Sequence, residues 1–404
     1  MTYRERLILY KEGKLSPEEE AKLEQEIERQ DAIGEYLYEE AELDIPDEEK
    51  SAEETEQTEG ENFSAMVDRS IRRAFIKLGV IVGAVVLAVS LSVIFLVPDV
   101  VDLFYYDPEE VVGIDKESDN VTTSRLSLDL SVYTELFVPR SFRNYASAVS
   151  RGYGIYDVMI PQVVGTGDNV YRAVSGQIIR GKLMLYDPNL LSTPADNAFL
   201  FPEGVEGNNK FIDVDGEPIG PAGKLEEAKV ALNNLNEGEN YMAYVSLKDI
   251  TDYGEFYQWI NGKELDYVDL WCVVYTEGEH GQLIDNNMGF QFRQGGLCIN
   301  WDREKYPHLS LLDSDFLQGN PLDDEKIMAE HFTSMLAYLH DHPDIMKLMG
   351  KEETDYSRQR YLDMIDYVEK NGLQLYGFAI TAEKDEIIKL MEDPKVSYIY
   401  TTGR

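Results

Sequence analysis

The chain has 404 residues and a formal net charge of −39 at pH 7, with 37 Lys and Arg against 76 Asp and Glu. Acidic residues outnumber basic ones both before and after an apolar run at residues 78–97, so neither part suits nucleic acid, whose phosphates would repel it. We therefore expect no nucleic-acid partner, and the length leaves room for more than one domain.

The first 45 residues are predicted to form a small helical module. Apolar side chains recur at helical spacing in residues 2–12, which indicates a short first helix. A second helix is expected to begin with Ser16 as N-cap, Pro17 at its first position and Glu19 two residues later, the pattern of a capping box. A third helical stretch is expected after Asp31.

The apolar side chains of this module allow two interpretations. Short amphipathic helices bury little surface and are marginal in isolation. Their apolar side chains therefore form either the module's own core or the anchors that enter a groove on a partner protein. We predict partner binding, and the candidate partner-facing residues are Leu7, Tyr10, Leu15, Leu23 and Ile27.

Residues 46–77 are predicted to be an acidic, disordered linker that ends in a basic juxtamembrane segment. The stretch 39–61 has many like charges and few apolar groups, a composition typical of disorder. The basic segment contains Arg69, Arg72, Arg73 and Lys77.

The run Leu78–Val97, LGVIVGAVVLAVSLSVIFLV, is predicted to be a transmembrane helix. A helix of this length spans about 30 Å, the thickness of the hydrocarbon core of a bilayer. Basic residues precede the run and Asp99 and Asp102 follow it, so the positive-inside rule places the N-terminus in the cytoplasm and the C-terminal part outside. The sequence thus predicts a single-pass protein of the cell membrane.

Residues 98–235 are predicted to be a strand-rich extracytoplasmic region. Leucines alternate with polar residues from Leu126 to Val132, which is the pattern of a half-buried strand. Further strands are expected at 153–160 and 177–186, and Asp215 with Gly216 forms a hairpin-type turn.

Residues 236–404 are predicted to be an α+β region, so the chain as a whole is α+β. Strands and helices alternate at both of its ends, which suggests ferredoxin-like units. Strands are expected at 241–247, 268–275, 374–380 and 396–401, and helices at 252–260, 328–339, 361–371 and 383–391.

The sequence offers little catalytic chemistry, and we predict no enzymatic activity, no metal and no cofactor. It lacks the short motifs of serine hydrolases, zinc proteases and phosphate-binding loops. His340 and His342 flank Asp341, but their place at a helix end before Pro343 favours a structural role. Cys272 and Cys298 lie in apolar contexts and form either a disulfide or two buried thiols.

Two segments resemble a known family. The string LYKEGKLSPEEEAKLEQEIERQDAIGEYL resembles the N-terminal segment of membrane-bound anti-sigma factors, in which a Gly-x-Leu-Ser-Pro-Glu-Glu step follows a short helix. Residues 1–77 contain no His and no Cys, so the zinc site of many such modules is absent, as in the zinc-free sigma factor regulator N-terminal family. The strings YVSLKDITDYGEFYQWI and YVEKNGLQLYGFAITAEKDEIIKLMEDPKVSYIYT resemble the sigma factor regulator C-terminal family.

The resemblance implies a transmembrane anti-sigma factor. Its cytoplasmic helices would sequester an extracytoplasmic-function sigma factor, and its outer domain would respond to an unknown envelope ligand or protein. Two alternatives remain open at this point. One is a membrane-anchored binding or sensor protein that recruits a different cytoplasmic partner, and the other is an envelope enzyme with a polar pocket.

Overall fold

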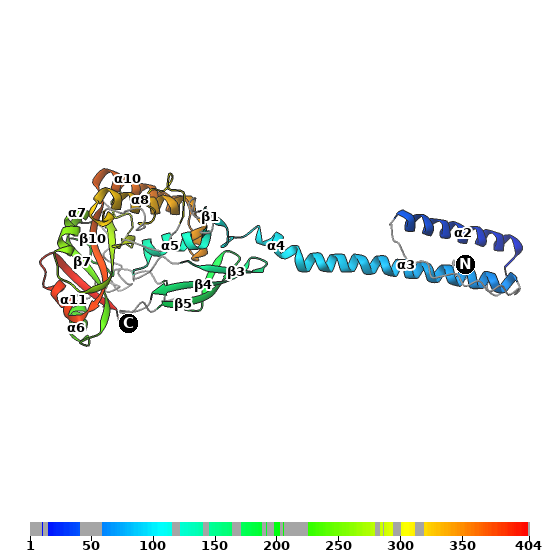
Figure 1. Ribbon diagram of the computed structural model, residues 1–404, viewed down its shortest axis with the longest axis horizontal. Coiled ribbons are helices and arrows are strands. Elements are labelled where there is room, and N and C mark those ends of the chain that lie inside the picture. Colours follow the sequence, from blue (N-terminus) through cyan, green and yellow to red (C-terminus); the bar gives the residue numbers. More distant parts are fainter. Residues whose placement is uncertain are drawn as a thin grey trace, which may run out of the picture. The chain divides into compact units, whose positions relative to one another are not determined.

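The fold was obtained as a computed structural model (Figure 1). The structure describes residues 10, 15–40, 59–114, 122–139, 145–163, 171–187, 191, 198–202, 205, 225–278, 283–285, 287–293, 300–311 and 319–402. The chain divides into two units, Met1–Val97 and Pro98–Arg404, which are described separately.

Helix α2 (Pro17–Glu40) begins where the sequence predicts. The Glu19 carboxylate accepts hydrogen bonds from the Ser16 backbone N–H at 3.2 Å and from the Ser16 hydroxyl at 2.7 Å, so the Glu19 half of the capping box is confirmed. The expected break at Asp31 is wrong, and the helix continues to Glu40. An interior Asp costs only a few tenths of a kcal/mol in helix propensity, and a cost of this size does not end the helix.

Helix α3 (Glu59–Phe95) is longer than the predicted transmembrane run. It includes the basic juxtamembrane segment and the last residues of the expected linker, whose residues 41–58 lie outside the described part. Its segment Ser70–Phe95 is long and apolar enough to cross a membrane, and its most apolar window has no buried residue. The helix ends at Phe95, two residues before the end of the predicted run, and Val97 starts α4 (Val97–Asp102), with Pro98 in the first turn, where a missing N–H does no harm.

The predicted strand at 126–132 is instead helix α5 (Arg125–Phe137), which follows a two-stranded sheet of β1 (Val111–Ile114) and β2 (Thr122–Ser124). The helix starts at Ser124, whose hydroxyl accepts from the Ser127 N–H. The alternating leucines divide between two helical faces: Leu126 and Leu130 pack into one core and Leu128 into another. Because the helix is buried on both faces, a period of two in the sequence did not mean a strand.

The second unit, Pro98–Arg404, contains a four-stranded antiparallel sheet in the order β3-β4-β5-β6. Its strands are β3 (Ser147–Gly152), β4 (Ile155–Val163), β5 (Tyr171–Ile179) and β6 (Lys182–Leu185). The expected strands differ at their ends: Tyr153 lies in the β3–β4 turn, and 177–186 contains the turn at Arg180 and Gly181. The predicted turn at Asp215 and Gly216 lies outside the described residues.

The second sheet has five antiparallel strands in the order β11-β7-β10-β8-β9. The strands are β7 (Asn240–Asp252), β8 (Tyr267–Tyr275), β9 (Gly289–Gln291), β10 (Gln374–Glu383) and β11 (Val396–Thr402). The helices are α6 (Leu225–Asn233), α7 (Tyr253–Asn261), α8 (Glu325–Asp341), α9 (Asp344–Leu348), α10 (Asp355–Asn371) and α11 (Lys384–Met391), with a 3-10 turn at Pro321–Asp323. The predicted strands and helices of this region are confirmed.

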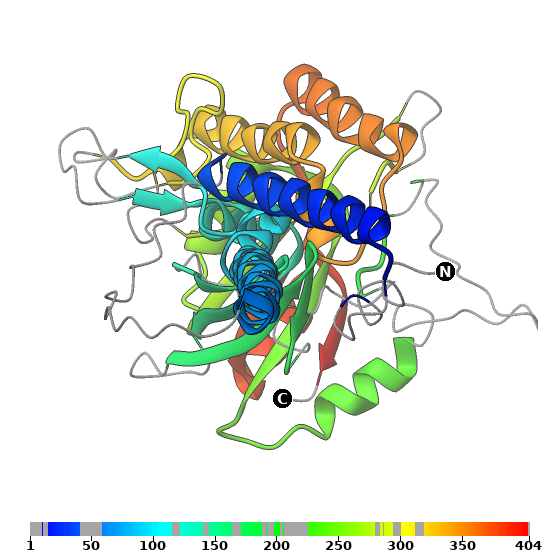
Figure 2. The same cartoon turned by 90° about the vertical axis from the view of Figure 1, so that its right-hand side faces the viewer.

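The main core lies between this sheet and its helices. Helices α8 and α10 pack side by side over it (Figures 1 and 2). Side chains from α5, α7, α8, α10 and α11 meet those of β7, β8 and β10 in one buried cluster. On the opposite face of the sheet, Phe199 and Phe201 cover Tyr244, Trp271 and Tyr376. Asp252 is the N-cap residue of α7, but its carboxylate accepts a hydrogen bond from Gln374 rather than from the helix.

Candidate functional site

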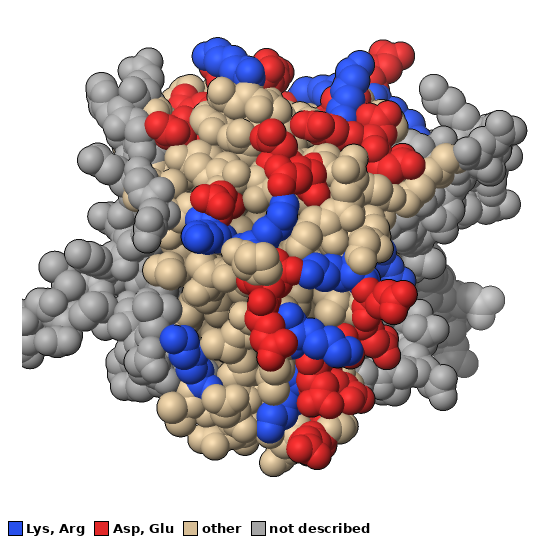
Figure 3. Space-filling model, turned by 90° about the vertical axis from the view of Figure 1, so that its left-hand side faces the viewer, with Lys and Arg blue, Asp and Glu red and all other residues tan. Residues whose placement is uncertain are grey.

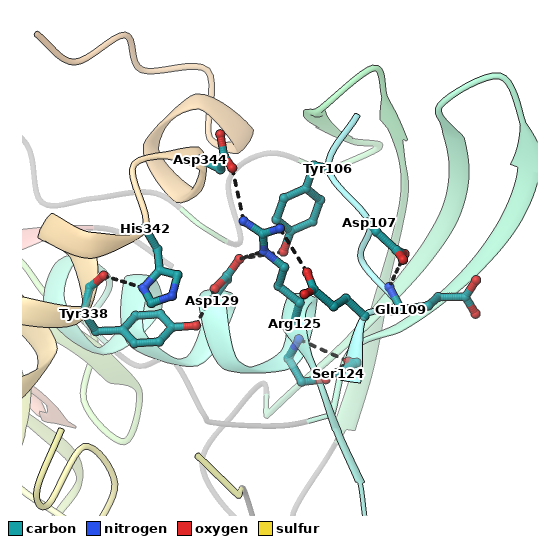
Figure 4. A network of polar contacts seen from close by, with 11 residues as sticks. Tyr106, Asp107, Glu109, Ser124, Arg125, Asp129, Tyr338, His342 and Asp344 are labelled. Atoms are coloured by element: carbon teal, nitrogen blue, oxygen red, sulfur yellow. Dashed lines mark hydrogen bonds and ion pairs between the residues drawn. The ribbon is translucent and has the colours of Figure 1, made fainter. Parts of the chain in front are cut away.

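A buried carboxyl group is the centre of a polar network in the second unit (Figure 4). Asp129, on the second turn of α5, is completely buried. Its two oxygens accept hydrogen bonds from the hydroxyls of Tyr106 and Tyr338, each at 2.7 Å. A buried carboxyl group is stable only with such partners. Burial raises the pKa of Asp129, while the hydrogen bonds from the two tyrosines and the charge of Arg125 act in the opposite direction.

Arg125 lies one turn before Asp129 and contacts three carboxyl groups. Its guanidinium nitrogens lie 3.1 Å from Glu110, 3.1 Å from Asp344 and 3.6 Å from Asp129. It also lies over the ring of Tyr106, 4.7 Å from the centroid. Burial disfavours the charged guanidinium, but the surrounding carboxylates outweigh burial and raise the pKa of Arg125. Arg125 is therefore a fixed cation whose charge is matched within the protein.

This network joins parts of the second unit that are far apart in sequence. Tyr106 follows α4, Arg125 and Asp129 belong to α5, and Tyr338 belongs to α8. His342, the C-cap of α8, stacks on Tyr338 with ring centroids 4.0 Å apart, and its Nδ1 lies 2.9 Å from the Tyr338 carbonyl. The segment after α4 and helix α8 are thus held to the same turn of α5.

A second buried pair ties α5 to α8. Glu135 Oε1 lies 2.6 Å from His331 Nε2, and both side chains are buried. The other ring nitrogen of His331 lies 2.7 Å from the His308 carbonyl, so Nδ1 is the atom that donates there. The Glu135 carbonyl accepts from the indole N–H of Trp271 at 2.8 Å, which links α5 to β8 as well.

A cavity of about 340 Å³ opens beside the Asp129 network. This size is that of a small-molecule site. One wall comes from β1, the segment before it and α5, and the other comes from the 301–306 segment and the end of α8. Its lining residues are Glu110, Val112, Arg125, Leu128, Trp301, Asp302, Lys305, Tyr306, Tyr338 and His342.

Several charged groups around the cavity are already paired. Lys305 lies 2.7 Å from Asp341, and the Tyr306 hydroxyl donates to the same carboxylate at 2.8 Å. Burial opposes ionisation of Asp341, but hydrogen bonds from Lys305, Tyr306 and His340 outweigh it and lower its pKa to about 2.

The two histidines of the His340-Asp341-His342 motif make internal contacts. His340 Nδ1 lies 3.1 Å from Asp341, and His342 contacts the Tyr338 carbonyl. Within the described residues, no group of three or more His, Cys, Asp or Glu is placed to hold a metal ion.

The predicted partner-facing residues are only partly brought together. Leu7 lies outside the described residues. The hydroxyl of Tyr10 donates to Glu24 of α2 at 3.0 Å, which places the Tyr10 side chain beside α2. Leu15 and Ile27 are half-buried, and Leu23 is buried within its own unit, as the alternative of an internal core requires.

Cys272, on β8, is completely buried, and burial raises the pKa of its thiol. Cys298 lies outside the described residues, so a bond between the two cysteines stays a prediction. The sequence reasoning missed the Asp129 and Glu135 networks. The available signal was an Asp and a Glu inside the leucine-rich string LSLDLSVYTELF.

Charges on the second unit are mixed. The face in Figure 3 shows Asp and Glu next to Lys and Arg, without a broad basic patch. Nothing on that face resembles the basic surface that nucleic acid requires.

Residues 232–400 match the family described as Sigma factor regulator C-terminal. The match runs from the end of α6 through the five-stranded sheet to β11, so this segment is a sigma factor regulator C-terminal domain. The family is regulatory rather than enzymatic, and it implies a sigma factor as partner. The search of curated proteins and the search of solved structures gave no match.

Proposed function

We propose that the protein is a membrane-bound anti-sigma factor. In this proposal the N-terminal helices bind an extracytoplasmic-function sigma factor at the membrane. The second unit, Pro98–Arg404, then lies outside the membrane as the outer unit and changes that binding in response to an envelope signal. The observation that carries the proposal is the match of residues 232–400 to a sigma factor regulator domain, in a chain with one helix long and apolar enough to span a membrane.

The proposed organisation follows the sequence. Basic residues before the span and Asp99 and Asp102 after it support an N-terminus in the cytoplasm. Regions of the chain then have these roles: 1–45 a sigma-binding module, 46–77 a linker and juxtamembrane segment, 78–97 the transmembrane segment, 98–235 a membrane-proximal outer region and 236–404 the outer α+β region.

A ferredoxin-like unit is a further part of the proposal. The order β11-β7-β10-β8, with α7 between β7 and β8 and α11 between β10 and β11, supports it. Helices α8 to α10 and strand β9 then form an insertion between its second and third strands.

Residues Leu7, Tyr10, Leu15, Leu23 and Ile27 are the proposed contacts with the sigma factor. Ile27 gives the cleanest test, because it is half-buried while Leu23 is already enclosed by its own unit. Apolar anchors at the centre of such an interface commonly contribute about 2 kcal/mol or more to binding.

The outer unit offers a route for a signal. The cavity lies where α5 meets both the membrane-proximal segment and the regulator domain. A molecule bound there contacts Arg125 and Tyr338 together, so binding favours one arrangement of α5 relative to α8. In this way the binding of an envelope ligand would affect the segment nearest the membrane.

Co-purification with sigma factors tests the proposal. The tagged full chain is expressed with each extracytoplasmic-function sigma factor of its host, beginning with any encoded beside it. We expect one stable complex, which Ile27→Asp abolishes and Gln25→Asp, an exposed change on the same helix, retains. Circular dichroism checks that both variants keep α2. Absence of any complex, with sigma-dependent transcription unchanged on deletion, contradicts the proposal and favours a sensor with another cytoplasmic partner.

A further inference from the structure

Large apolar side chains are exposed directly after the apolar helix. Leu103 is 82% exposed and Phe104 is 79% exposed, and Val100 on α4 is 51% exposed. Single exposed apolar residues are common on soluble surfaces, but two adjacent large ones beside a third form a patch. Such a patch indicates an interaction surface.

The segment that carries this patch is firmly attached to the outer unit. Asp102, at the end of α4, accepts a hydrogen bond from the Gly154 N–H at 2.5 Å and another from the Ser150 hydroxyl at 3.0 Å. Both donors belong to the tip of the β3–β4 hairpin. Leu103 and Phe104 are therefore exposed on an attached segment, because the adjacent residue Asp102 is held in place.

Two glycines allow this close approach. Gly152 and Gly154 have φ of 78° and 73°, a region that side chains disfavour. A Cβ on Gly152 would lie 2.6 Å from Pro98, and one on Gly154 would lie 2.6 Å from the Tyr105 ring. The hairpin tip thus fits against the backbone that links the apolar helix to the outer unit.

We propose that Val100, Leu103 and Phe104 form an interfacial anchor that inserts into the outer surface of the lipid bilayer. The proposal rests on the membrane span in the proposed function. Phe104 is only nine residues after the end of α3, so the chain itself keeps the patch near the bilayer surface. Aromatic and aliphatic side chains that flank a span prefer this interfacial region.

The charges near the anchor favour apolar insertion over attraction to lipid headgroups. Asp99, Asp107, Glu109 and Glu110 lie in the same stretch of chain, with Arg125 as the cation that contacts Glu110. An acidic surface is repelled by anionic lipid. The anchor is therefore expected to bind zwitterionic bilayers at least as well as anionic ones.

The anchor also positions the outer unit. Because Asp102 fastens α4 to the β3–β4 hairpin, insertion of Leu103 and Phe104 fixes the four-stranded sheet relative to the bilayer. Asp102 is in this sense a positioning residue between the bilayer and the outer unit.

Tryptophan quenching in vesicles tests the anchor with the full chain. Phe104→Trp is reconstituted in phosphatidylcholine vesicles that contain brominated acyl chains, with the emission of the wild-type tryptophans subtracted. Tyr356→Trp is the matched control, since Tyr356 is 90% exposed at the start of α10. Leu87→Trp, within the apolar helix, reports the span itself.

We expect brominated lipid to quench Phe104→Trp at least about twofold more than Tyr356→Trp, and aqueous iodide to do the reverse. Equal iodide access to both positions while Leu87→Trp is quenched by lipid overturns the anchor but leaves the span intact. Failure of lipid to quench Leu87→Trp overturns the span and the anchor together. Stronger quenching of Phe104→Trp in anionic than in zwitterionic vesicles contradicts apolar insertion as the cause.

Discussion

Helices α3 and α5 reverse the usual relation between polarity and burial. The segment 78–95 of α3 has no charged side chain, yet its side chains are exposed, with Leu87 60% exposed. In α5 nearly every second residue is polar, yet every residue from Leu126 to Phe137 is buried. The stability of each helix therefore depends on what surrounds it.

The comparison shows what each environment demands. An exposed apolar helix is stable where the surroundings are themselves apolar, as in a bilayer. A buried polar helix is stable where each polar group has a partner. In α5, Ser131 and Thr134 donate to carbonyls one turn back at 2.6 and 2.7 Å, while Asp129 has two tyrosine hydroxyls as donors.

Charges placed in α3 should have the largest effect. Leu87→Arg with Leu91→Arg adds two cations four residues apart, at a cost of about 6 kcal/mol for membrane insertion. We expect the double variant to lose its resistance to alkaline carbonate extraction from membranes. Ile33→Arg with Ile71→Arg also adds two cations but leaves 78–95 unchanged, and it should stay membrane-bound. Retention of the Leu87/Leu91 variant would mean that α3 is not a membrane span.

Removal of the buried carboxyl group of α5 should have the next largest effect. Asp129→Ala leaves Arg125 and two tyrosine hydroxyls without this partner, and we expect a loss of about 3–5 kcal/mol in the free energy of unfolding. Urea unfolding of the full chain in detergent, followed by tryptophan fluorescence, measures it. Asp129→Asn, which keeps an acceptor, should lose less. Glu109→Ala is the surface control, because Glu109 points away from the network (Figure 4).

Loss of the α5 cap should have a smaller effect. Ser124→Ala removes the hydroxyl that accepts from the Ser127 N–H, and we expect a loss of about 1 kcal/mol in the free energy of unfolding. Ser147→Ala, an exposed change on β3, should be near neutral in the same urea experiment. An effect of Ser124→Ala no larger than this control would indicate that packing alone fixes the start of α5.

Acidification should destabilise the outer unit and leave membrane retention through α3 unchanged. No such difference is expected at neutral pH. The folded pKa of Asp341 is about 2, below the value near 3.9 of an unfolded Asp, so its contribution is full above about pH 4 and is lost toward pH 2. Asp129 has the opposite sign, because its raised pKa makes stability fall as pH rises through that pKa.

Near-UV circular dichroism of the full chain between pH 5 and pH 2 measures the acid loss. We expect Asp341→Asn to show a shallower loss than the wild type, and Asp355→Asn, a fully exposed change, to match the wild type. Residues 78–98 contain no ionisable side chain, so membrane retention should not change over this range. An unchanged acid profile in Asp341→Asn would contradict the assigned role of this carboxylate.

The regulator domain was largely predictable because its signals are local. Apolar side chains of α8 recur at helical spacing, Asn371 and Gly372 end α10, and β8 is a short apolar strand. Neighbouring residues supply these signals, so a single sequence is sufficient to place the elements. The fold of α5 and the candidate site were not predictable in this way. The cavity wall joins residues near 110 and 125 to residues near 301 and 338, and no local pattern encodes that approach.

The sequence by itself determined the apolar helix, the start of α2 at Ser16 and most elements after residue 240, because composition, caps and periodicity act over a few residues. Only the tertiary structure decided that the leucines of α5 serve two cores and that Asp129 and Glu135 are buried with partners. It also decided that Asp102 is fastened to the β3–β4 hairpin. These features depend on contacts between segments distant in sequence, whose free energies a local pattern does not contain.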